Sequence, residues 1–219
     1  MTGAIVFDFD GVILESADLK TVAFVEMFAE RPEHQDAIRA HHLENLGISR
    51  YEKFRWIYAN LFHEPLTEQR SAELGQQFSD LVFDKVLACP FVPGARQALD
   101  ALHGTRPLYV ASGTPHEELL RIIDHRGLGH LFDGVHGSPR PKASVLEEVA
   151  HTHGLPLDAI LMVGDGESDH RAARKAGTRF YARRTPDLFD TWDRLGVPGH
   201  PDMTCFVDYV AAEASDSDA

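Results

Sequence analysis

Carboxylates, a serine and a lysine stand in this sequence at four points where a predicted strand ends or a predicted helix begins. They are Asp8 with Asp10, Ser112, Lys142, and Asp165 with Asp169. Converging carboxylates repel one another, and Mg²⁺, which takes oxygen ligands and keeps positions for water and phosphate, is the usual remedy. Lys142, Ser112 and the backbone N–H groups of helix starts could hold an anion beside such a metal. A metal and donors facing a carboxylate predict a phosphoryl-transfer site with a carboxylate nucleophile.

An α/β core is needed to bring these four clusters together. Strands are predicted near 4–9, 107–112, 134–136, 159–164 and 178–183, and helices near 96–102, 143–152 and 168–176. A further helix is predicted to start around Thr114, with Pro115 at its first position. Strands that alternate with helices imply a doubly wound, Rossmann-like parallel sheet covered on both faces. Ligands bind such sheets beyond the carboxyl ends of the strands, which is where Asp8 and Asp10 stand.

The segment between the first strand and the rest of the core is predicted to be helical throughout. Apolar residues recur at helical spacing in three stretches, with Val22, Val25 and Phe28, then Tyr51, Phe54 and Tyr58, then Leu74, Phe78 and Leu81. Ser49 and Glu52 predict a capping box at the second helix. We therefore expect a catalytic core of residues 1–14 and 86–219, with a helical cap of residues 15–85 inserted after the first strand. Residues 185–203 indicate only a helix and a loop.

Composition and charge exclude several classes of partner. The net charge is −13, from 21 Lys and Arg against 34 Asp and Glu, and the absence of a basic stripe argues against nucleic acid. Neither a targeting signal nor an apolar run of the roughly 20 residues that span a bilayer is evident, so we expect a cytoplasmic protein without a membrane partner. Cys89 and Cys205 are expected to be buried, reduced thiols. Whether the protein is a monomer or a homodimer stays open, and the polar stretch EASDSDA is expected to fray.

Four segments, in order along the chain, resemble the four motifs of the haloacid dehalogenase superfamily. They are "DFDGVILES", "VASGTP", "GSPRPKAS" and "VGDGESD". One DxDG is a weak signal, but four motifs in order, each at a strand end, are a strong one. The resemblance covers nearly the whole chain, including the helical insertion. It looks closest to the branch that includes phosphoglycolate phosphatase and β-phosphoglucomutase.

The resemblance implies a catalytic or phosphate-binding role for five residues. Asp8 would be the nucleophile and form an aspartyl-phosphate. Asp10 would protonate the leaving oxygen and later activate water. Ser112, helped by the Gly113 amide, would bind the transferring phosphoryl group, while Lys142 would bind phosphate and restrain the Asp8 carboxylate.

The resemblance also implies a Mg²⁺ cofactor. Asp8, the backbone carbonyl of Asp10, and Asp165 would bind the metal, and Asp169 would ligate it or orient its waters. Gly11 would let the chain turn close to the substrate.

Plainer structural roles are open for several of these residues. Asp165 and Asp169 could cap the helix that begins near Ser168. Ser112 could simply end its strand, and Lys142 could be a solvated surface residue. Asp8 or Asp10 alone could belong to a turn, although two such acids after a buried strand favour catalysis.

Recognition of the leaving group is expected to involve the helical segment. "LENLGISRYEKFRW" places Arg50, Lys53 and Arg55 close to a helix start, in a protein that is short of basic residues. We expect Arg50 and Lys53 to recognise a second anionic or hydroxyl-rich part of the substrate. The alternative is a solvated helix face that takes no part in the reaction.

Taken together, these features predict a Mg²⁺-dependent phosphatase. Its partner would be a small phosphorylated metabolite, such as a sugar phosphate, hydrolysed through an aspartyl-phosphate. One alternative is a phosphomutase or phosphotransferase that uses the same residues but returns the phosphoryl group to a hydroxyl. Another is a non-catalytic protein that senses phosphate or metal in the same pocket.

Overall fold

The computed structural model describes residues 1–215, which contain a six-stranded sheet in the order β3-β2-β1-β4-β5-β6. The strands are β1 (Ala4–Phe7), β2 (Leu108–Pro115), β3 (Gly134–Ser138), β4 (Ile160–Gly164), β5 (Arg179–Arg183) and β6 (Gly199–His200). Every neighbouring pair is parallel. Strand β1 lies between β2 and β4, with Ile5 opposite both Leu108 and Leu161. The predicted α/β fold class is confirmed.

Helices cover both faces of the sheet, and the alternation of side chains along β1 explains why. Ile5 and Phe7 join one apolar cluster, whereas Ala4 and Val6 join the other. The core helices are α5 (Ala95–Leu102), α6 (His116–His125), α7 (Lys142–His153), α8 (Glu167–Ala176), α9 (Phe189–Leu195) and α10 (Phe206–Ser215). Apolar side chains of α5, α6 and α10 belong to the first cluster, and those of α7, α8 and α9 belong to the second. Both faces of β1 are therefore buried, as a central parallel strand requires.

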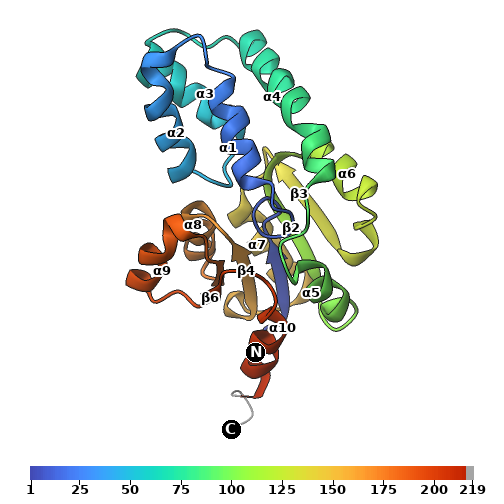
Figure 1. The fold of residues 1–219 in the computed structure, drawn as a ribbon. Helices are drawn as coiled ribbons and strands as arrows, with labels where there is room; N and C mark the ends of the chain where they lie inside the picture. The colour runs from blue at the N-terminus through green and yellow to red at the C-terminus, as the bar shows by residue number, and fades with distance from the viewer. Residues whose placement is uncertain (216–219) are drawn as a thin grey trace.

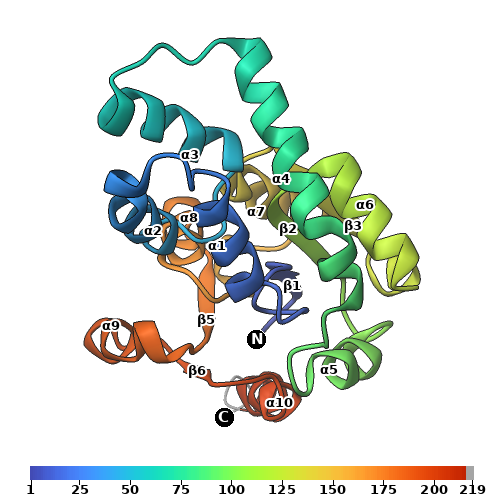
Figure 2. The ribbon, with the colours of Figure 1, turned by 45° about the horizontal axis from the view of Figure 1, so that its top comes forward.

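Four further helices lie beyond the end of the sheet at which β1 stops (Figure 1). They are α1 (Ala17–Glu26), α2 (Gln35–Glu44), α3 (Arg50–Ile57) and α4 (Glu68–Ala88). Single turns of 3₁₀ or π helix occupy Pro32–His34, Tyr58–Phe62, Gly129–Leu131, Leu157–Ala159 and Pro186–Leu188. Figure 2 shows α1 and α2 side by side, with α4 reaching back to α6. We call α1–α4 the cap helices; their status as a separate domain with boundaries at 15 and 85 stays a prediction.

The predicted helices are present in the cap region, but two apolar residues of the pattern are exposed and the predicted capping box is wrong. Val22 is 51% exposed and Leu81 is 38% exposed, although both fit a helical apolar pattern. In α1 the buried side runs through Lys20 and Phe24, one turn apart, which turns Val22 towards solvent. Ser49 does precede α3, but its side chain makes no capping hydrogen bond, and Glu52 is exposed.

Other differences lie in the core. Strand β2 continues to Pro115, so the proline precedes α6 and is not its first residue. Cys89 is buried as expected, but Cys205 is exposed. Helix α10 continues through Ser215, so the predicted frayed tail does not begin at Glu213, and residues 216–219 of that stretch lie outside the described residues. No helix within residues 1–215 is long and apolar enough to cross a membrane.

The segment 185–203, for which the sequence indicates no function, has a structural role. Trp192 in α9 is fully buried, with its ring centroid 5.6 Å from that of Phe180 and 6.0 Å from that of His170. Strand β6 then pairs with β5 at the edge of the sheet. The segment therefore seals the face of the sheet covered by α7 and α8.

Candidate active site

Asp8 is the first residue after β1, and the backbone holds its carboxylate in place. Its own N–H donates to Val163 O at 2.8 Å, which continues the pairing with β4. The N–H of Phe9 donates to Asp8 Oδ1 at 2.7 Å. Gly11 then turns the chain at φ +76°, and a Cβ on Gly11 would lie 2.0 Å from Asp165 Oδ2. Glycine is required here because the turn packs directly against a second acid of the site.

Three buried carboxylates and one buried ammonium meet beyond β1 and β4. Oxygens of Asp8, Asp165 and Asp169 lie within 4.8 Å of one another. Asp165 directly follows β4, Asp169 lies in the first turn of α8, and Lys142 is the first residue of α7. Lys142 Nζ lies 3.0 Å from Asp8 Oδ2 and 2.5 Å from Asp169 Oδ1. Among the predicted residues, these four are thus brought into one cluster, and Lys142 is not a solvated surface residue.

Burial and mutual repulsion disturb the protonation of this cluster. Burial raises the pKa of Asp8 to about 7; Lys142 opposes the shift, and Asp169 and Asp10 add to it. Burial, followed by the charges of Asp8 and Asp169, also raises the pKa of Asp165. For Lys142 the pKa is raised, because Asp169 and Asp8 outweigh the effect of burial. Without a bound cation, ionisation of all three carboxylates in this cluster is therefore unfavourable.

A hard divalent cation fits this cluster. Three carboxylates face only one ammonium, which leaves two negative charges without compensation. Asp165 Oδ2 is buried and accepts no hydrogen bond from any residue of the described chain. Buried polar atoms are normally satisfied, so an oxygen left free beside two other carboxylates is suited to a metal ligand. The donor set consists of carboxylate oxygens, which is the chemistry that Mg²⁺ prefers.

Ser112 and Gly113 lie near the carboxyl end of β2, beside the acidic cluster. Ser112 is buried, and its Oγ accepts a hydrogen bond from the Thr114 N–H at 3.1 Å. Ser112, Gly113 and Lys142 together line a cavity of about 270 Å³. These three predicted phosphate-binding residues therefore border one space, as an anion site would require.

Asp10 lies outside the carboxylate cluster, and its side chain is fully hydrogen-bonded. Oδ1 accepts from Ser16 Oγ at 2.6 Å, and Oδ2 accepts from Lys20 Nζ at 2.6 Å and Thr114 Oγ1 at 2.9 Å. Burial alone would raise the pKa of Asp10, but Lys20 and these hydrogen bonds outweigh it, and the pKa is lowered. The side chain is thus held ionised, and metal binding through the Asp10 backbone carbonyl stays a prediction.

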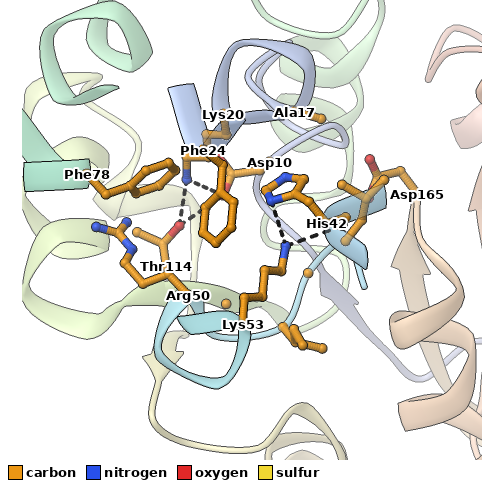
Figure 3. A pocket seen from close by; sticks show the side chains of 14 residues that line it. Asp10, Ala17, Lys20, Phe24, His42, Arg50, Lys53, Phe78, Thr114 and Asp165 are labelled. Atoms are coloured by element: carbon orange, nitrogen blue, oxygen red, sulfur yellow. Dashed lines mark hydrogen bonds and ion pairs between the residues drawn. The ribbon is translucent and has the colours of Figure 1, made fainter. Parts of the chain in front are cut away.

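A second, smaller cavity of about 60 Å³ lies between Asp10 and the cap helices (Figure 3). Arg50 and Lys53 both line it, with exposed fractions of 5% and 4%. The solvated helix face that the sequence left as an alternative is therefore wrong for these two residues, although it describes Arg55, which is exposed. Figure 3 shows Lys20 and Thr114 joined to Asp10 on one side of the cavity, and Lys53 joined to His42 on the other.

The loop that joins α2 to α3 closes over the core residues. A Cβ on Gly47 would lie 2.8 Å from Lys142 Nζ, and one on Gly113 would lie 2.5 Å from Gly47 O. The hydroxyl of Ser168 donates to Leu46 O in the same loop. The cap helices and the core therefore touch through backbone at this point, and neither glycine could carry a side chain without a shift of the loop.

Several residues of the site were missed by sequence reasoning. They are Ser16, Lys20, Phe24, His42, Thr114 and Glu118. Thr114 stands inside "VASGTP" and could have been found there, and Lys20 is a rare cation near the first motif. His42 and Glu118 carry no signal of their own, because their place depends on how α2 and α6 pack against α3.

Comparison with known proteins identifies the family of the chain and solved structures with the same fold. The family model described as haloacid dehalogenase-like hydrolase matches residues 2–177. A phosphoglycolate phosphatase of Aliivibrio fischeri is 27% identical over 191 residues, which cover 81% of this chain and 82% of the relative. The structure of a hydrolase from Pseudomonas syringae matches with a TM-score of 0.75 at 15% identity, covering 96% of this chain and 98% of the other. A β-phosphoglucomutase structure from Clostridium difficile matches with a TM-score of 0.74 at 14% identity, covering 99% of each chain.

Proposed function

Because the chain belongs to the haloacid dehalogenase-like hydrolase family, we propose that it is a Mg²⁺-dependent phosphatase that hydrolyses a small phosphate monoester. The observation that carries the proposal is the buried cluster of Asp8, Lys142, Asp165 and Asp169, in which one Asp165 oxygen has no partner within the described residues. Such a cluster has too many carboxylates for a stable core and the right oxygens for a metal.

Asp8 is the nucleophile in this proposal. The Phe9 N–H and Lys142 fix its carboxylate, so one oxygen can face the phosphorus of the substrate. A bond forms between the carboxylate and phosphorus while the ester P–O bond breaks, which gives an aspartyl-phosphate and the leaving alcohol. Water then attacks the same phosphorus, inorganic phosphate leaves, and Asp8 returns as a carboxylate.

Asp10 moves the protons. In the second half-reaction its ionised carboxylate accepts the proton of the attacking water, and its lowered pKa keeps this form populated. In the first half-reaction the leaving oxygen needs a proton, so Asp10 must first take one up from solvent, against Lys20 and the hydrogen bonds that lower its pKa, and then donate it. Lys20 and Thr114 both bond to Asp10 Oδ2, so they set the orientation from which the proton is delivered.

Ser112, the Gly113 amide and Lys142 hold the phosphoryl oxygens, since all three border one cavity and Lys142 Nζ lies 3.0 Å from Asp8 Oδ2. Asp8, Asp165 and Asp169 are the side chains that would hold Mg²⁺. When bound, Mg²⁺ supplies positive charge that offsets the charge of the phosphoryl group. Arg50 and Lys53, which the sequence predicts to recognise the leaving group, line the smaller cavity.

A small substrate is part of this proposal. The cavity between Asp10 and the cap helices has a volume of about 60 Å³, which accommodates a leaving group of a few heavy atoms. The relative from Aliivibrio fischeri carries the name phosphoglycolate phosphatase, which makes phosphoglycolate the first compound to try. A cytoplasmic location belongs to the same proposal.

Phosphate release in the presence of Mg²⁺ tests the function. Wild type and Asp8→Asn are assayed on phosphoglycolate, sugar phosphates and nucleotides. We expect turnover by wild type and a loss of at least about a thousandfold in Asp8→Asn, since the nucleophile is removed. Turnover by Asp8→Asn comparable with wild type would contradict the nucleophile, and a wild type inactive on the whole panel would favour a sensor of phosphate or metal.

The same assay separates hydrolysis from phosphoryl transfer. A phosphotransferase would pass the group to an added hydroxyl compound, so consumption of substrate would exceed the release of inorganic phosphate. For a phosphatase the two amounts are equal at every concentration of added glycerol or sugar.

A further inference from the structure

Helix α3 places two buried cations in the smaller cavity, and their surroundings differ. Arg50 Nη2 donates to Glu118 Oε1 at 2.8 Å, and Arg50 Nη1 donates to Glu118 Oε2 at 3.0 Å and to Ser79 Oγ at 2.7 Å. Its guanidinium also lies 4.5 Å from the ring centroid of Phe78. This bidentate pair uses the donors and the charge of Arg50. Arg50 is therefore already neutralised by a residue of the core.

Lys53 has no such partner. Its Nζ lies 3.2 Å from His42 Nδ1 and 3.4 Å from His42 O, and it forms no ion pair with a carboxylate of residues 1–215. Burial, followed by the charge of Lys53, lowers the pKa of His42 to about 2, so the imidazole is neutral and its Nδ1 can accept a hydrogen bond from Lys53 without supplying any negative charge. The Lys53 ammonium has three N–H donors. Its two contacts with His42 leave a donor that can point into the cavity (Figure 3).

A buried ammonium without an anion is costly, and the protein supplies little to offset the cost. Burial lowers the pKa of Lys53 to about 7. The ring of Phe24, centred 5.6 Å away, is a weak substitute for a carboxylate. Asp10 and Asp165 line the same cavity and act on Lys53 through their charge, but neither forms an ion pair with it, so an anion in direct contact with the ammonium must come from what enters the cavity.

We infer that Lys53 binds an anionic group, a carboxylate or a second phosphate, on the leaving group of the substrate, whereas Arg50 fastens the cap helices to the core through Glu118. This inference rests on the proposed phosphatase function and narrows its substrate class. Phosphate esters whose leaving group carries an anion are selected, and esters with only hydroxyl or alkyl groups are poor substrates. Lys142 lines the larger cavity and Lys53 the smaller one, with Gly47 bordering both, so in this proposal Lys142 serves the reacting phosphate and Lys53 the second anion of the substrate.

The test compares three substrates that share a phosphate ester: phosphoglycolate, ethane-1,2-diol bisphosphate and ethyl phosphate. Wild type and Lys53→Met are assayed, with Arg55→Met, an exposed cation of the same helix, as the matched control. We expect Lys53→Met to raise KM for the anionic substrates by roughly tenfold to a hundredfold, with kcat nearly unchanged, as for the loss of a charge-assisted hydrogen bond. KM for ethyl phosphate should change less than about twofold, and Arg55→Met should change nothing. Whichever anionic substrate wild type prefers identifies the anion as a carboxylate or a phosphate.

The pH profile is a second readout that a merely structural role would not move. The ratio of kcat/KM for the preferred anionic substrate to kcat/KM for ethyl phosphate should fall as pH rises through the pKa of Lys53, and Lys53→Met should flatten it. Titration of the ester phosphate cancels in the ratio. The charged groups that act on Lys53 are Lys20, Asp10, Asp165 and Lys142, and His42 is its direct neighbour. A ratio equal in wild type and Lys53→Met at every pH would overturn the inference and leave the phosphatase function intact.

A binding measurement tests the inference even if no substrate is turned over. Calorimetric titration of wild type and Lys53→Met with the same three esters needs no chemistry. Tighter binding of an anionic ester than of ethyl phosphate in wild type, lost in Lys53→Met, supports the inference even if the proposed reaction fails. Wild type that binds all three alike, or none, overturns it. A circular dichroism spectrum of Lys53→Met that matches that of wild type shows that the variant is folded.

Discussion

The core side of the candidate site and the side of the cap helices have opposite charge imbalances. On the core side, three buried carboxylates share one ammonium, and an oxygen of Asp165 has no partner in the described chain. On the side of the cap helices, Arg50 is balanced by Glu118, but Lys53 is not balanced by any carboxylate of residues 1–215. Both imbalances are buried, so solvent cannot relieve them.

The difference is what the proposed function and the proposed role of Lys53 would require. A surplus of carboxylates is relieved by a divalent cation, and a surplus ammonium is relieved by an anion. Arg50 and Glu118 show that this chain can build a fully paired buried ion pair at the same depth. The unpaired groups are therefore a property of the two binding surfaces and not of the fold as a whole.

Removal of the metal should have the largest effect, because it leaves the three carboxylates on the core side with one ammonium as their counter-charge. We expect chelation to reduce phosphate release by at least about a thousandfold and added Mg²⁺ to restore it. Asp165→Asn should stay inactive in Mg²⁺. As an independent measurement, Mg²⁺ should raise Tm for wild type but not for Asp165→Asn, with Asp187→Asn as an exposed control. An equal rise in Tm for both variants would place the metal elsewhere.

Breaking the balanced pair of Arg50 and Glu118 should rank second. Arg50→Met leaves the Glu118 carboxylate buried and alone, which should lower the free energy of unfolding by about 3–5 kcal/mol. Arg50→Met with Glu118→Leu should recover most of this loss, because no buried charge then remains. The control is Arg96→Met, which breaks an exposed pair with Asp100 and should cost less than about 1 kcal/mol. Urea unfolding measures all three, and a double variant as unstable as the single one would contradict the argument.

The protonation of Asp8 should make the metal-free protein less stable as pH rises. The pKa of Asp8 is raised from 3.8 to about 7, so between these values the folded state keeps a proton that the unfolded state has lost. The free energy of unfolding should therefore fall between about pH 4 and pH 7, by at most about 4 kcal/mol. Asp10, whose pKa is lowered, acts below this window. Urea unfolding in a chelator checks the trend, and an Asp8→Asn variant with the same slope would contradict it.

Addition of one methyl group where the loop of the cap helices contacts the core should have the smallest effect of these changes. Gly47→Ala combines a φ of +80° with a Cβ 2.8 Å from Lys142 Nζ. Gly104→Ala is the matched control, since its φ is +76° and nothing lies within 4 Å. Both should lose about 1 kcal/mol of stability from the backbone, but only Gly47→Ala should also raise KM, by a few-fold. Equal KM values for the two variants would show that the loop is not part of the site.

The core side could be predicted from sequence because parallel strands bring their carboxyl ends to one edge. Asp8 and Asp165 follow adjacent strands, and Lys142 and Asp169 begin the helices beside them. Their meeting depends only on the order of strands and helices. The short motifs were therefore enough to predict both the fold class and the residues that form the cluster.

The side of the cap helices could not be predicted in the same way. Arg50 and Glu118 are 68 residues apart, and no pattern in the sequence links the two positions. Whether a cation on α3 is solvated, paired or left unpaired depends on how α3 packs against α2, α4 and α6. Apolar periodicity fails at Val22 for a related reason, because α1 buries Lys20 and Phe24 in the cavity and turns the valine outward.

The central position of β1 also has a consequence for the order in which the chain acquires its structure. Among the six strands of the described sheet this one is synthesised first, but its neighbours begin at Leu108 and Ile160. Until both have emerged from the ribosome, β1 presents apolar side chains and unpaired N–H and C=O groups on either edge. The strand that leads to Asp8 is thus made before the other five but can be enclosed on both edges only after β2 and β4 have been made.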